Sequence, residues 1–589
     1  MSIIKTLREW NKKRLHLRRR GRHWATYGDW IKQQSQHCAV VSPNAATVLV
    51  VVDVTSCSLK ALIKTCDTLA AQVQSNWLVR FVCGNSTNAR DTFAMKRAIS
   101  SLDARATWCD NDQARVSLAK DIESCQIEWL CLLEAGNTLT HHAFASVLNE
   151  ASCRPGLRLI YGDHDHIDSR ETRFAPHFKP DLNPEMLLSW NYIGNTFFIR
   201  AADLSLDDLF RDQADLDAQR WRILLKATNG AHAEEVCHLP QILHHVWHDG
   251  TKARPGQDDV TCGTTRVTTG MAAVLKEHLD QHMPRSTFSE LPGHIGFHVH
   301  FAIPEPAPLV TIVIPTRNAK QLVEQCVGSL LAVTDYPSYE IILIDNGSDD
   351  PAALDYFQKL AQDPRVRVIR DDRPFNYSAL NNAAIPLANG ELILLLNNDT
   401  EFKQSEWLRE MVSLSVQPGI GCVGAKLLYP NGNIQHVGVI TGIGGVAGHA
   451  YVGAPGNAKG YFNRALMLHS VSVVTAACLM IKRSVYEEVG GLNEADLAVA
   501  YNDVDFCLRV RDAGYRNVLT PFAVAYHHET ATRGSDFDRI NIDRFRREQA
   551  YMLRVWGATL EYDPAYNVNL TLKGCNFEIS PQPRTYKHA

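Results

Sequence analysis

Polar side chains follow buried hydrophobic strands at two places in the C-terminal half of the chain. Asp345 closes the apolar run in the motif IDNGS, and a carboxylate there can accept hydrogen bonds from a base or a sugar. Three polar residues, Asn397, Asn398 and Asp399, follow consecutive leucines in the motif LLLNNDT. Asp399 is a hard oxygen ligand suited to Mg²⁺ or Mn²⁺ on a diphosphate. Taken alone, each motif is also typical of an ordinary polar turn.

Two more polar clusters come later in the chain. The motif YNDVDFCLR brings Asp503 and Asp505 close together, next to Arg509. Neighbouring carboxylates shift each other's pKa, so one of them can act as a general base. The alternative is a helix with Asp503 as its N-cap and Arg509 in a salt bridge. Further on, His527 and His528 follow a strand and could supply a nitrogen ligand to the same metal, although such histidines usually only pack or face solvent.

The elements that would position these residues occur twice. Residues 48–86 and 311–348 both read as strand, helix, strand in the same register, and a second pair of buried strands starts at Glu128 and Glu391. Strands alternating with helices predict an α/β fold with a mostly parallel sheet in each half. Ligands bind beyond the C-terminal ends of such strands, which is where the polar motifs lie.

Length and composition limit the classes of function. A chain of 589 residues is too long for one core, so at least two domains are expected. The net charge of −4 gives no bulk field that would draw nucleic acid. The 15 cysteines form no C-x-x-C pair, which favours a reducing compartment. With neither an apolar membrane span nor a signal peptide in the sequence, we expect a cytoplasmic protein.

Residues 1–34 depart from the average, because they hold ten basic side chains against two acidic ones. Several apolar residues in this segment fall roughly on one helical face. A basic amphipathic helix can lie on an anionic membrane surface, which would place the protein on the inner face of the cell membrane. The alternative is a solvated arm or a helix packed on the next domain.

Several motifs in order carry a resemblance to a known family. Residues 308–535 resemble an inverting family 2 glycosyltransferase of the GT-A fold. The runs VTAACLMIKRSVYEEVGGLNE, YNDVDFCLRVRDAGY and YHHETATRG are similar to a bacterial two-domain type that builds surface polysaccharides. The resemblance implies two tandem Rossmann-like GT-A domains, of which the N-terminal copy is degenerate.

Composition and the resemblance together predict five segments along the chain. They are a basic helical arm at 1–40, a degenerate GT-A-like domain at 41–300, a proline-rich linker at 301–308, a catalytic GT-A domain at 309–560 and a C-terminal extension at 561–589.

The resemblance also implies roles for the residues that bind the donor. The family's base-contacting Asp corresponds to Asp345, and the family's nucleotide loop corresponds to Pro315, Thr316 and Arg317. The family's D-x-D motif appears here as Asn397-Asn398-Asp399. Its first position is therefore an amide, which can bond a ribose but is a weaker, neutral contact to a metal shell.

The remaining roles concern the metal and the base. Asp399 inherits metal binding, a late-strand histidine completes the metal shell in several relatives, and we favour His527 over His528. Asp503 inherits the role of general base, with Asp505, Arg509 and His528 as supporting residues. The implied reaction is a single in-line displacement on a UDP- or dTDP-sugar by a hydroxyl of a glycan, with hexosyl or rhamnosyl transfer to a lipid-linked O-antigen, capsule or similar acceptor.

In the N-terminal copy the corresponding positions are altered. Cys83 stands in the place of Asp345, and Gly136 stands in the place of Asp399. By approximate alignment, Ala218 replaces the base. We therefore expect an inactive domain that binds acceptor or acts as a scaffold. Within it, the sequence 163–165 (Asp-His-Asp) could bind a metal, but a structural turn is the favoured prediction.

Two other functions remain open at this point. A sugar nucleotidyltransferase could share the fold, but no glycine-rich phosphate loop with a lysine is found near the first strand. A non-catalytic carbohydrate-binding or scaffold protein would suit the N-terminal half. It gives no reason, however, for the ordered carboxylates of the C-terminal half.

Overall fold

The computed structural model describes residues 26–34, 46–55, 57–83, 89–100, 104–211, 215–248, 266–528 and 541–584. Of the predicted membrane contact through residues 1–34, residues 1–25 lie outside these ranges. Within them, helix α2 (Tyr27–Gln34) is the first element. No helix in the described ranges is both long enough and apolar enough to cross a bilayer.

The chain divides into two compact units, each made of non-contiguous ranges of the sequence. The N-terminal unit comprises residues 1–182, 191–275 and 566–589, and the C-terminal unit comprises residues 183–190 and 276–565. A compact unit is defined by its contacts, whereas a domain is defined by independent folding. The domain boundaries that we expect from the sequence therefore stay predictions.

The N-terminal unit is built on one mixed sheet, whose central strands are continuous apolar runs buried on both faces. Its strand order is β3-β2-β1-β4-β8-β6-β9-β5, with β7 paired to β6. The strands are β1 (Val48–Asp53), β2 (Trp77–Cys83), β3 (Ala106–Asp110), β4 (Trp129–Glu134), β5 (Thr138–Leu139), β6 (Leu159–Asp168), β7 (Arg173–His177), β8 (Phe197–Arg200) and β9 (Val236–His248). The main helices are α3 (Leu59–Ala70), α4 (Ala89–Ser100), α5 (Asn111–Ser124), α6 (Ala143–Cys153) and α9 (Leu216–Thr228).

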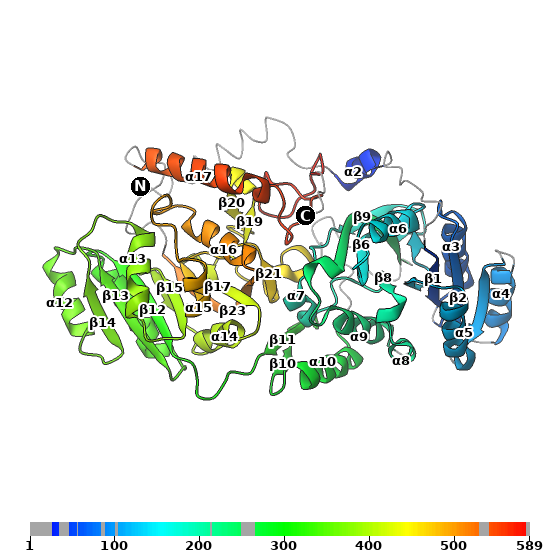
Figure 1. The fold of residues 1–589 in the computed structure, drawn as a ribbon, viewed down its shortest axis with the longest axis horizontal. Coiled ribbons are helices and arrows are strands. Elements are labelled where there is room, and N and C mark those ends of the chain that lie inside the picture. Colours follow the sequence, from blue (N-terminus) through cyan, green and yellow to red (C-terminus); the bar gives the residue numbers. More distant parts are fainter. Residues whose placement is uncertain are drawn as a thin grey trace. The chain divides into compact units, whose positions relative to one another are not determined.

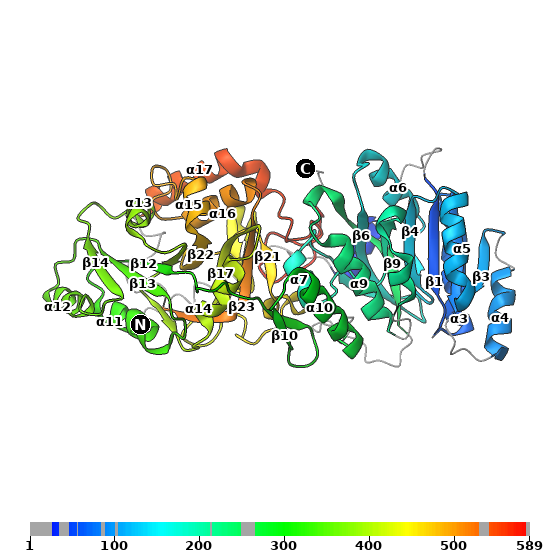
Figure 2. The same ribbon diagram turned by 60° about the horizontal axis from the view of Figure 1, so that its bottom comes forward.

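The C-terminal unit has a sheet of the same design, in the order β14-β13-β12-β15-β22-β17-β23-β16. The strands on this path are β12 (Val310–Thr316), β13 (Tyr339–Asp345), β14 (Val366–Arg370), β15 (Leu392–Leu396), β16 (Thr400–Phe402), β17 (Ile420–Leu428), β22 (Cys478–Lys482) and β23 (Arg516–His527). The helices are α10 (Thr269–His282), which begins in the N-terminal unit, α11 (Lys320–Val333), α12 (Pro351–Leu360), α13 (Tyr377–Ala384), α14 (Trp407–Ser415), α15 (Arg483–Glu488), α16 (Asn502–Asp512) and α17 (Ile542–Leu560). Helices α14 and α16 pack on opposite faces of this sheet (Figures 1 and 2).

The two sheets match strand for strand. When the strands on each path are numbered along the chain, both have the same spatial order and the same pattern of parallel and antiparallel neighbours. Most of the pairs along each path are parallel, so the predicted α/β class with mostly parallel sheets is confirmed. The corresponding strand ends of the two units can therefore be compared residue by residue.

Candidate active site

A pocket of about 820 Å³ lies at the C-terminal ends of β12 and β15 in the C-terminal unit. These strands are parallel neighbours, so their ends meet at one edge of the sheet. The predicted site residues that line the pocket are Pro315, Thr316, Arg317, Asn397, Asn398, Asp399, Asp503 and His527. Asp345, Asp505, Arg509 and His528 do not line it.

Asn397 and Asn398, which precede Asp399, make hydrogen bonds at the ends of β15 and β12. The Asn398 Nδ2 group donates to Thr316 Oγ1 at 2.8 Å, which links the end of β15 to the end of β12. The backbone oxygen of Asn397 accepts a hydrogen bond from Thr400 Oγ1 at 3.0 Å. These bonds close the turn that presents the Asp399 side chain to the pocket.

The side chains of Asp399 and His527 lie close together in the pocket. The Asp399 Oδ1 atom lies 3.0 Å from His527 Nε2. This oxygen is nevertheless buried and makes no well-directed hydrogen bond to any described residue. His527 Nδ1 lies 2.6 Å from Gln435 Oε1, and since an amide oxygen only accepts, the ring proton sits on Nδ1. In that tautomer Nε2 has a free lone pair and accepts a hydrogen bond from Asn397 Nδ2 at 3.2 Å.

A carboxylate oxygen and an imidazole nitrogen 3.0 Å apart, with no directed hydrogen bond between them, suit a divalent cation bound to both. The residues present therefore fit a metal. No group of three or more His, Cys, Asp or Glu side chains in the described ranges could enclose one. Burial raises the pKa of the nearby Cys326 thiol to about 12, so this sulfur stays protonated. Further ligands would have to come from substrate or water.

Asp503 lies at the second position of α16, after Tyr501, which is in the left-handed region at φ 60°. It is not the N-cap, so the alternative reading of Asp503 as a helix cap is wrong. Its Oδ2 atom accepts a hydrogen bond from Ala476 N at 3.1 Å, and its Oδ1 atom accepts one from Val504 N at 2.9 Å. The side chain is half-buried and lines the pocket, which leaves it accessible to a substrate hydroxyl.

A buried glutamate of α17 positions the segment that leads to Asp503. Glu548 is 2% exposed and accepts hydrogen bonds from Val499 N at 2.9 Å and from Ala500 N at 3.2 Å. Because each carboxylate oxygen takes one amide, the backbone before α16 is fixed at two points. No local sequence motif indicates this role, since Glu548 lies on a separate helix.

We expect Glu548→Gln to lower both stability and turnover. In the variant, the side-chain NH₂ group replaces one carboxylate oxygen and therefore faces a backbone N–H that has lost its acceptor. A buried donor without an acceptor costs about 1–3 kcal/mol. Urea unfolding should show this loss of unfolding free energy, and transfer should slow because Asp503 is held less firmly. Asp543→Asn, an exposed change on the same helix, is the control. Unchanged stability in Glu548→Gln would refute this positioning role.

The three supporting residues lie behind the pocket. Asp505 is 1% exposed, accepts from Arg509 Nε at 2.9 Å and from Trp556 Nε1 at 2.9 Å, and so joins α16 to α17. The His528 ring lies 3.1 Å from Gln325 Nε2 and 3.4 Å from Glu401 Oε2, away from the pocket. Asp505 and Arg509 therefore have a structural role in this state.

Asp345 ends β13, as the sequence indicates, but its carboxylate already has partners. It accepts hydrogen bonds from Ser348 N at 2.9 Å and from Arg370 Nη1 at 2.8 Å. Hydrogen bonds to Asp372 and Asp345 raise the pKa of Arg370. The next residue, Asn346, does line the pocket. The role of Asp345 in contacting a base therefore stays a prediction.

Several pocket residues could not be found from sequence motifs. Gln435 orients His527, His449 lies 2.9 Å from the neutral imidazole of His436 (Nδ1 to Nδ1), and Phe545 comes from α17. Burial lowers the pKa of His436 well below its usual range. Phe375 is 47% exposed and adds an apolar side chain to the lining.

In the N-terminal unit both metal ligands are missing at the matching positions. Val48 pairs with Trp129 as Val310 pairs with Leu392, so Gly136 takes the place of Asp399. In the pair β5–β9, Leu139 faces His244 as Phe402 faces Ala525 in the pair β16–β23. Two residues further along β9 and β23, Val246 takes the place of His527. Neither glycine nor valine offers a side-chain ligand.

The carboxylate of the base position is retained, contrary to the sequence alignment. Asp217 is the second residue of α9, as Asp503 is the second of α16, so the prediction that Ala218 replaces the base is wrong. Asp215 caps α9 by accepting a hydrogen bond from Ala218 N, which fixes where the helix starts. Asn195 Nδ2 donates to Asp217 Oδ1 at 2.6 Å.

The sequence 163–165 lies within strand β6, so the predicted turn is wrong. Asp163 is fully buried and bonds His238 Nε2 at 2.9 Å and Asn567 Nδ2 at 3.0 Å. Burial alone would lower the pKa of His238, but Asp163 and Asp181 outweigh it and raise the pKa to about 9. Asp163 is therefore one half of a buried ion pair rather than a free metal ligand.

Comparisons with known proteins find similarity to one family over part of the chain. Residues 311–490 match the family model described as "Glycosyl transferase family 2". The chain is 38% identical over 545 residues to the "Uncharacterized protein y4gI" of Sinorhizobium fredii, covering 91% of this chain and 59% of that protein. It is 31% identical over 529 residues to the O-antigen biosynthesis protein RfbC of Myxococcus xanthus, covering 89% of this chain and 40% of that protein.

Two weaker similarities were also found. The putative colanic acid biosynthesis glycosyl transferase WcaA of Escherichia coli K12 is 35% identical over 124 residues, covering 21% of this chain and 42% of that protein. The crystal structure of GalNAc-T7 with UDP, GalNAc and Mn²⁺ shares 15% identity over 45% of this chain and 50% of that chain, with a TM-score of 0.37, too low to support an argument. The chain spans about half the length of the longer relatives it matches. Residues 311–490, which include Asp399, are therefore similar to the glycosyl transferase family 2.

Proposed function

We propose that the C-terminal unit transfers a sugar from a nucleotide-diphosphate sugar to a hydroxyl of a glycan, with inversion at the anomeric carbon. Asp503 is the general base, and Asp399 with His527 holds the Mg²⁺ or Mn²⁺ that binds the donor diphosphate. The observation that carries the proposal is the Asp399–His527 pair, whose facing atoms share no directed hydrogen bond, in the same pocket as the half-buried Asp503 carboxylate.

The residues divide the work as follows. A metal bound there would offset negative charge that develops on the leaving diphosphate. Asp503 accepts the proton of the acceptor hydroxyl, and its bonds to Ala476 N and Val504 N hold the carboxylate in place. Thr316, Asn346 and Arg317 line the side of the pocket near β12 and would contact the nucleotide, either UDP or dTDP.

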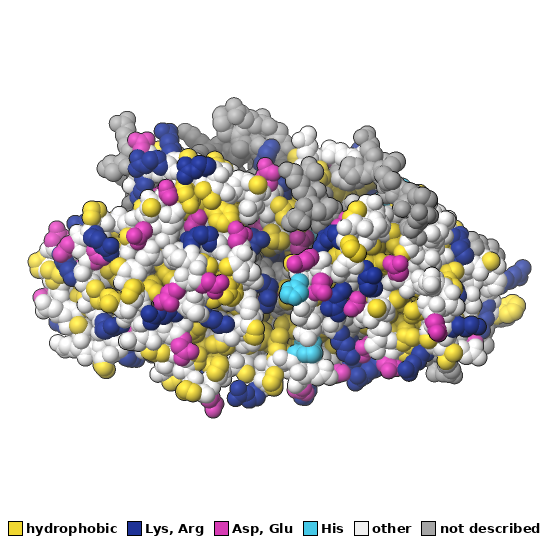
Figure 3. Space-filling model, in the orientation of Figure 1, with side chains coloured by type: hydrophobic (Ala, Val, Ile, Leu, Met, Phe, Trp, Pro, Cys, Tyr) yellow, Lys and Arg dark blue, Asp and Glu magenta, His cyan; other side chains and the backbone are white. Residues whose placement is uncertain are grey.

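The acceptor is proposed from the relatives. RfbC is named for O-antigen biosynthesis and WcaA for colanic acid biosynthesis, so a surface polysaccharide, lipid-linked during assembly, is the proposed acceptor class. Within the predicted segment 1–34, residues 1–25, which carry nine of its ten basic side chains, would hold the protein at the anionic inner face of the membrane. Basic and acidic side chains are interspersed on the face in Figure 3.

The stereochemistry can be tested without knowing the acceptor. Water can take the place of the acceptor hydroxyl, so donor hydrolysis reports the stereochemistry of the same displacement. With an α-linked nucleotide sugar, NMR should show the β-anomer of the free sugar first, before mutarotation. Initial release of the α-anomer would contradict a single displacement with Asp503 as base.

We propose that the N-terminal unit does not transfer sugar, because Gly136 and Val246 replace both metal ligands. Asp217→Asn should therefore leave the rate of transfer by the full chain unchanged, although Asp217 has the position of the base. The rate is measured with the same donor and compared with Asp503→Asn. A loss of transfer in Asp217→Asn comparable to that in Asp503→Asn would show a second active centre.

A further inference from the structure

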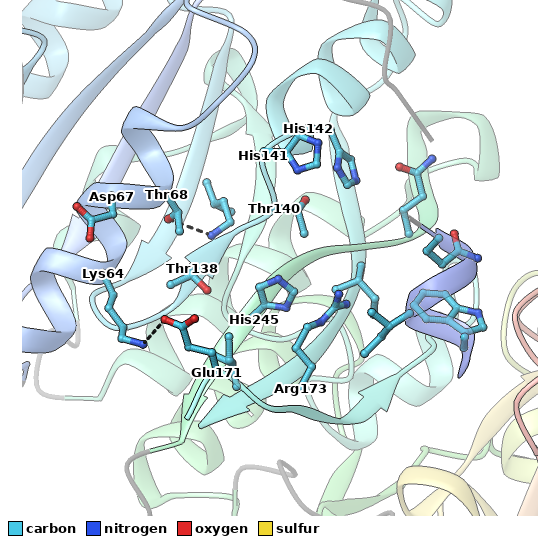
Figure 4. Close-up of a pocket in the computed structure, with 17 residues that line it drawn as sticks. Lys64, Asp67, Thr68, Thr138, Thr140, His141, His142, Glu171, Arg173 and His245 are labelled. Carbon is cyan, nitrogen blue, oxygen red and sulfur yellow. Dashed lines mark hydrogen bonds and ion pairs between the residues drawn. The ribbon is translucent and has the colours of Figure 1, made fainter. Parts of the chain in front are cut away.

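The N-terminal unit contains a second pocket, of about 560 Å³, within the range of about 300–1,000 Å³ typical of small-molecule sites. Helices α2 and α3 and strands β5, β6, β7 and β9 contribute side chains to it (Figure 4). Gly136 and Asp217 are not among its lining residues. This pocket is therefore separate from the position that corresponds to the active site.

Helix α2 is a fixed wall of this pocket. Trp30 is 2% exposed, and its ring lies 5.1 Å from that of Phe178 and 5.5 Å from that of Tyr27. The Tyr27 hydroxyl donates to the buried carboxylate of Asp165. An aromatic cluster and a buried hydrogen bond thus hold a short helix that would be unstable in isolation.

The arginine and lysine side chains at the pocket already have partners within the unit. Arg173 Nε donates to Asp165 Oδ2 at 2.6 Å, and His245 Nδ1 contacts the other oxygen of the same carboxylate. Lys64 pairs with Glu171 at 3.9 Å, an interaction drawn in Figure 4. Since the positive charges are matched by carboxylates, the pocket is not built for a phosphate or another anion.

Two polar atoms of the lining lack a partner. Trp30 Nε1 and Thr138 Oγ1 are buried and make no hydrogen bond to any described residue. Around them, aliphatic side chains such as Leu139 and Ile242 alternate with hydroxyl, imidazole and amide groups. This mixture fits a neutral ligand that has both apolar C–H faces and hydroxyl groups able to donate and accept.

We propose that this pocket binds one sugar unit of the acceptor glycan, through hydrogen bonds to Trp30 and Thr138. The proposal rests on the proposed function, because it takes the acceptor to be a glycan. The N-terminal unit would then hold the acceptor chain, while chemistry takes place in the other unit.

The test uses the full chain without nucleotide. Saturation-transfer-difference NMR measures binding of free glucose, mannose, galactose, rhamnose and N-acetylglucosamine, one at a time. Thr138→Val keeps the side-chain shape and removes the hydroxyl, and Trp30→Phe removes the N–H. Thr196→Val is the matched control, since Thr196 Oγ1 is also buried without a partner but does not line the pocket.

We expect at least one sugar to bind, with affinity reduced about tenfold in Thr138→Val and unchanged in Thr196→Val. If no sugar binds, or if binding is the same in both threonine variants and in Trp30→Phe, the proposal is overturned. Donor hydrolysis by the same samples is measured separately. Hydrolysis without sugar binding would remove only this inference, whereas sugar binding without hydrolysis would remove only the proposed function.

Discussion

Replacing Asp503 with Asn is expected to slow sugar transfer by about 10²–10⁴-fold while the donor still binds. Asparagine keeps the shape of the side chain, and its remaining oxygen can still accept the hydrogen bond from Ala476 N. It cannot take a proton from the acceptor at neutral pH. Donor affinity, measured by calorimetry, should stay close to that of the native chain because Asp503 does not contact the diphosphate in this account.

The control is Asp512→Asn, an exposed aspartate at the end of the same helix. It makes the same chemical change without reaching the pocket, so transfer should be normal. If Asp503→Asn turned over donor and acceptor at a rate close to that of Asp512→Asn, Asp503 could not be the base.

The second large effect concerns the metal pair. His527→Ala should abolish tight Mn²⁺ binding in the presence of nucleoside diphosphate, because it removes one of the two protein ligands. Electron paramagnetic resonance of free Mn²⁺ measures this binding directly. Asp399→Ala should have an effect at least as large, since it removes the only carboxylate of the pair.

His528→Ala is the matched control, because His528 adjoins His527 but its ring faces Gln325 and Glu401. We expect its Mn²⁺ affinity to be unchanged. The opposite result, with loss in His528→Ala and none in His527→Ala, would exchange the roles of the two histidines and contradict the tautomer assigned from Gln435.

Much of the site could be predicted because it follows from strand ends. Asn397, Asn398 and Asp399 come directly after a fully buried apolar strand, and the parallel neighbour β12 brings Thr316 to the same edge. The periodicity of the hydrophobic residues in the sequence indicates where these strands end. For the same reason, Cys83 and Gly136 could be matched to positions in the C-terminal unit before the structure was known.

The rest depends on contacts between distant segments. Asp163 and Asp165 look like a turn in the sequence, but a buried strand can hold them because His238, Asn567 and Arg173 neutralise or bond them. The start of α9 depends on the cap at Asp215, which the motif alignment missed by one residue. The partner of Asp345, Arg370, comes from the next strand and has no signal in the motif.

The duplicated sheet gives a physical reason for the asymmetry between the two units. Both have a carboxylate at the start of the corresponding helix, Asp217 and Asp503, yet only the C-terminal unit has the pair Asp399 and His527. Without a metal to bind the donor diphosphate, a general base at Asp217 would have no bound donor sugar for the acceptor to attack. The N-terminal unit is then free to serve a binding role, which the pocket beside Trp30 offers.

The most direct test of the account is the release of nucleoside diphosphate from a panel of UDP-, dTDP- and GDP-sugars by the full chain. Each donor is assayed with Mn²⁺ or Mg²⁺ and again with EDTA, in the native chain and in Asp399→Ala. The account predicts release from a UDP- or dTDP-sugar that requires the metal and disappears in Asp399→Ala. Equal release in the presence of EDTA, or undiminished release by Asp399→Ala, would contradict the proposed metal site and with it the central claim.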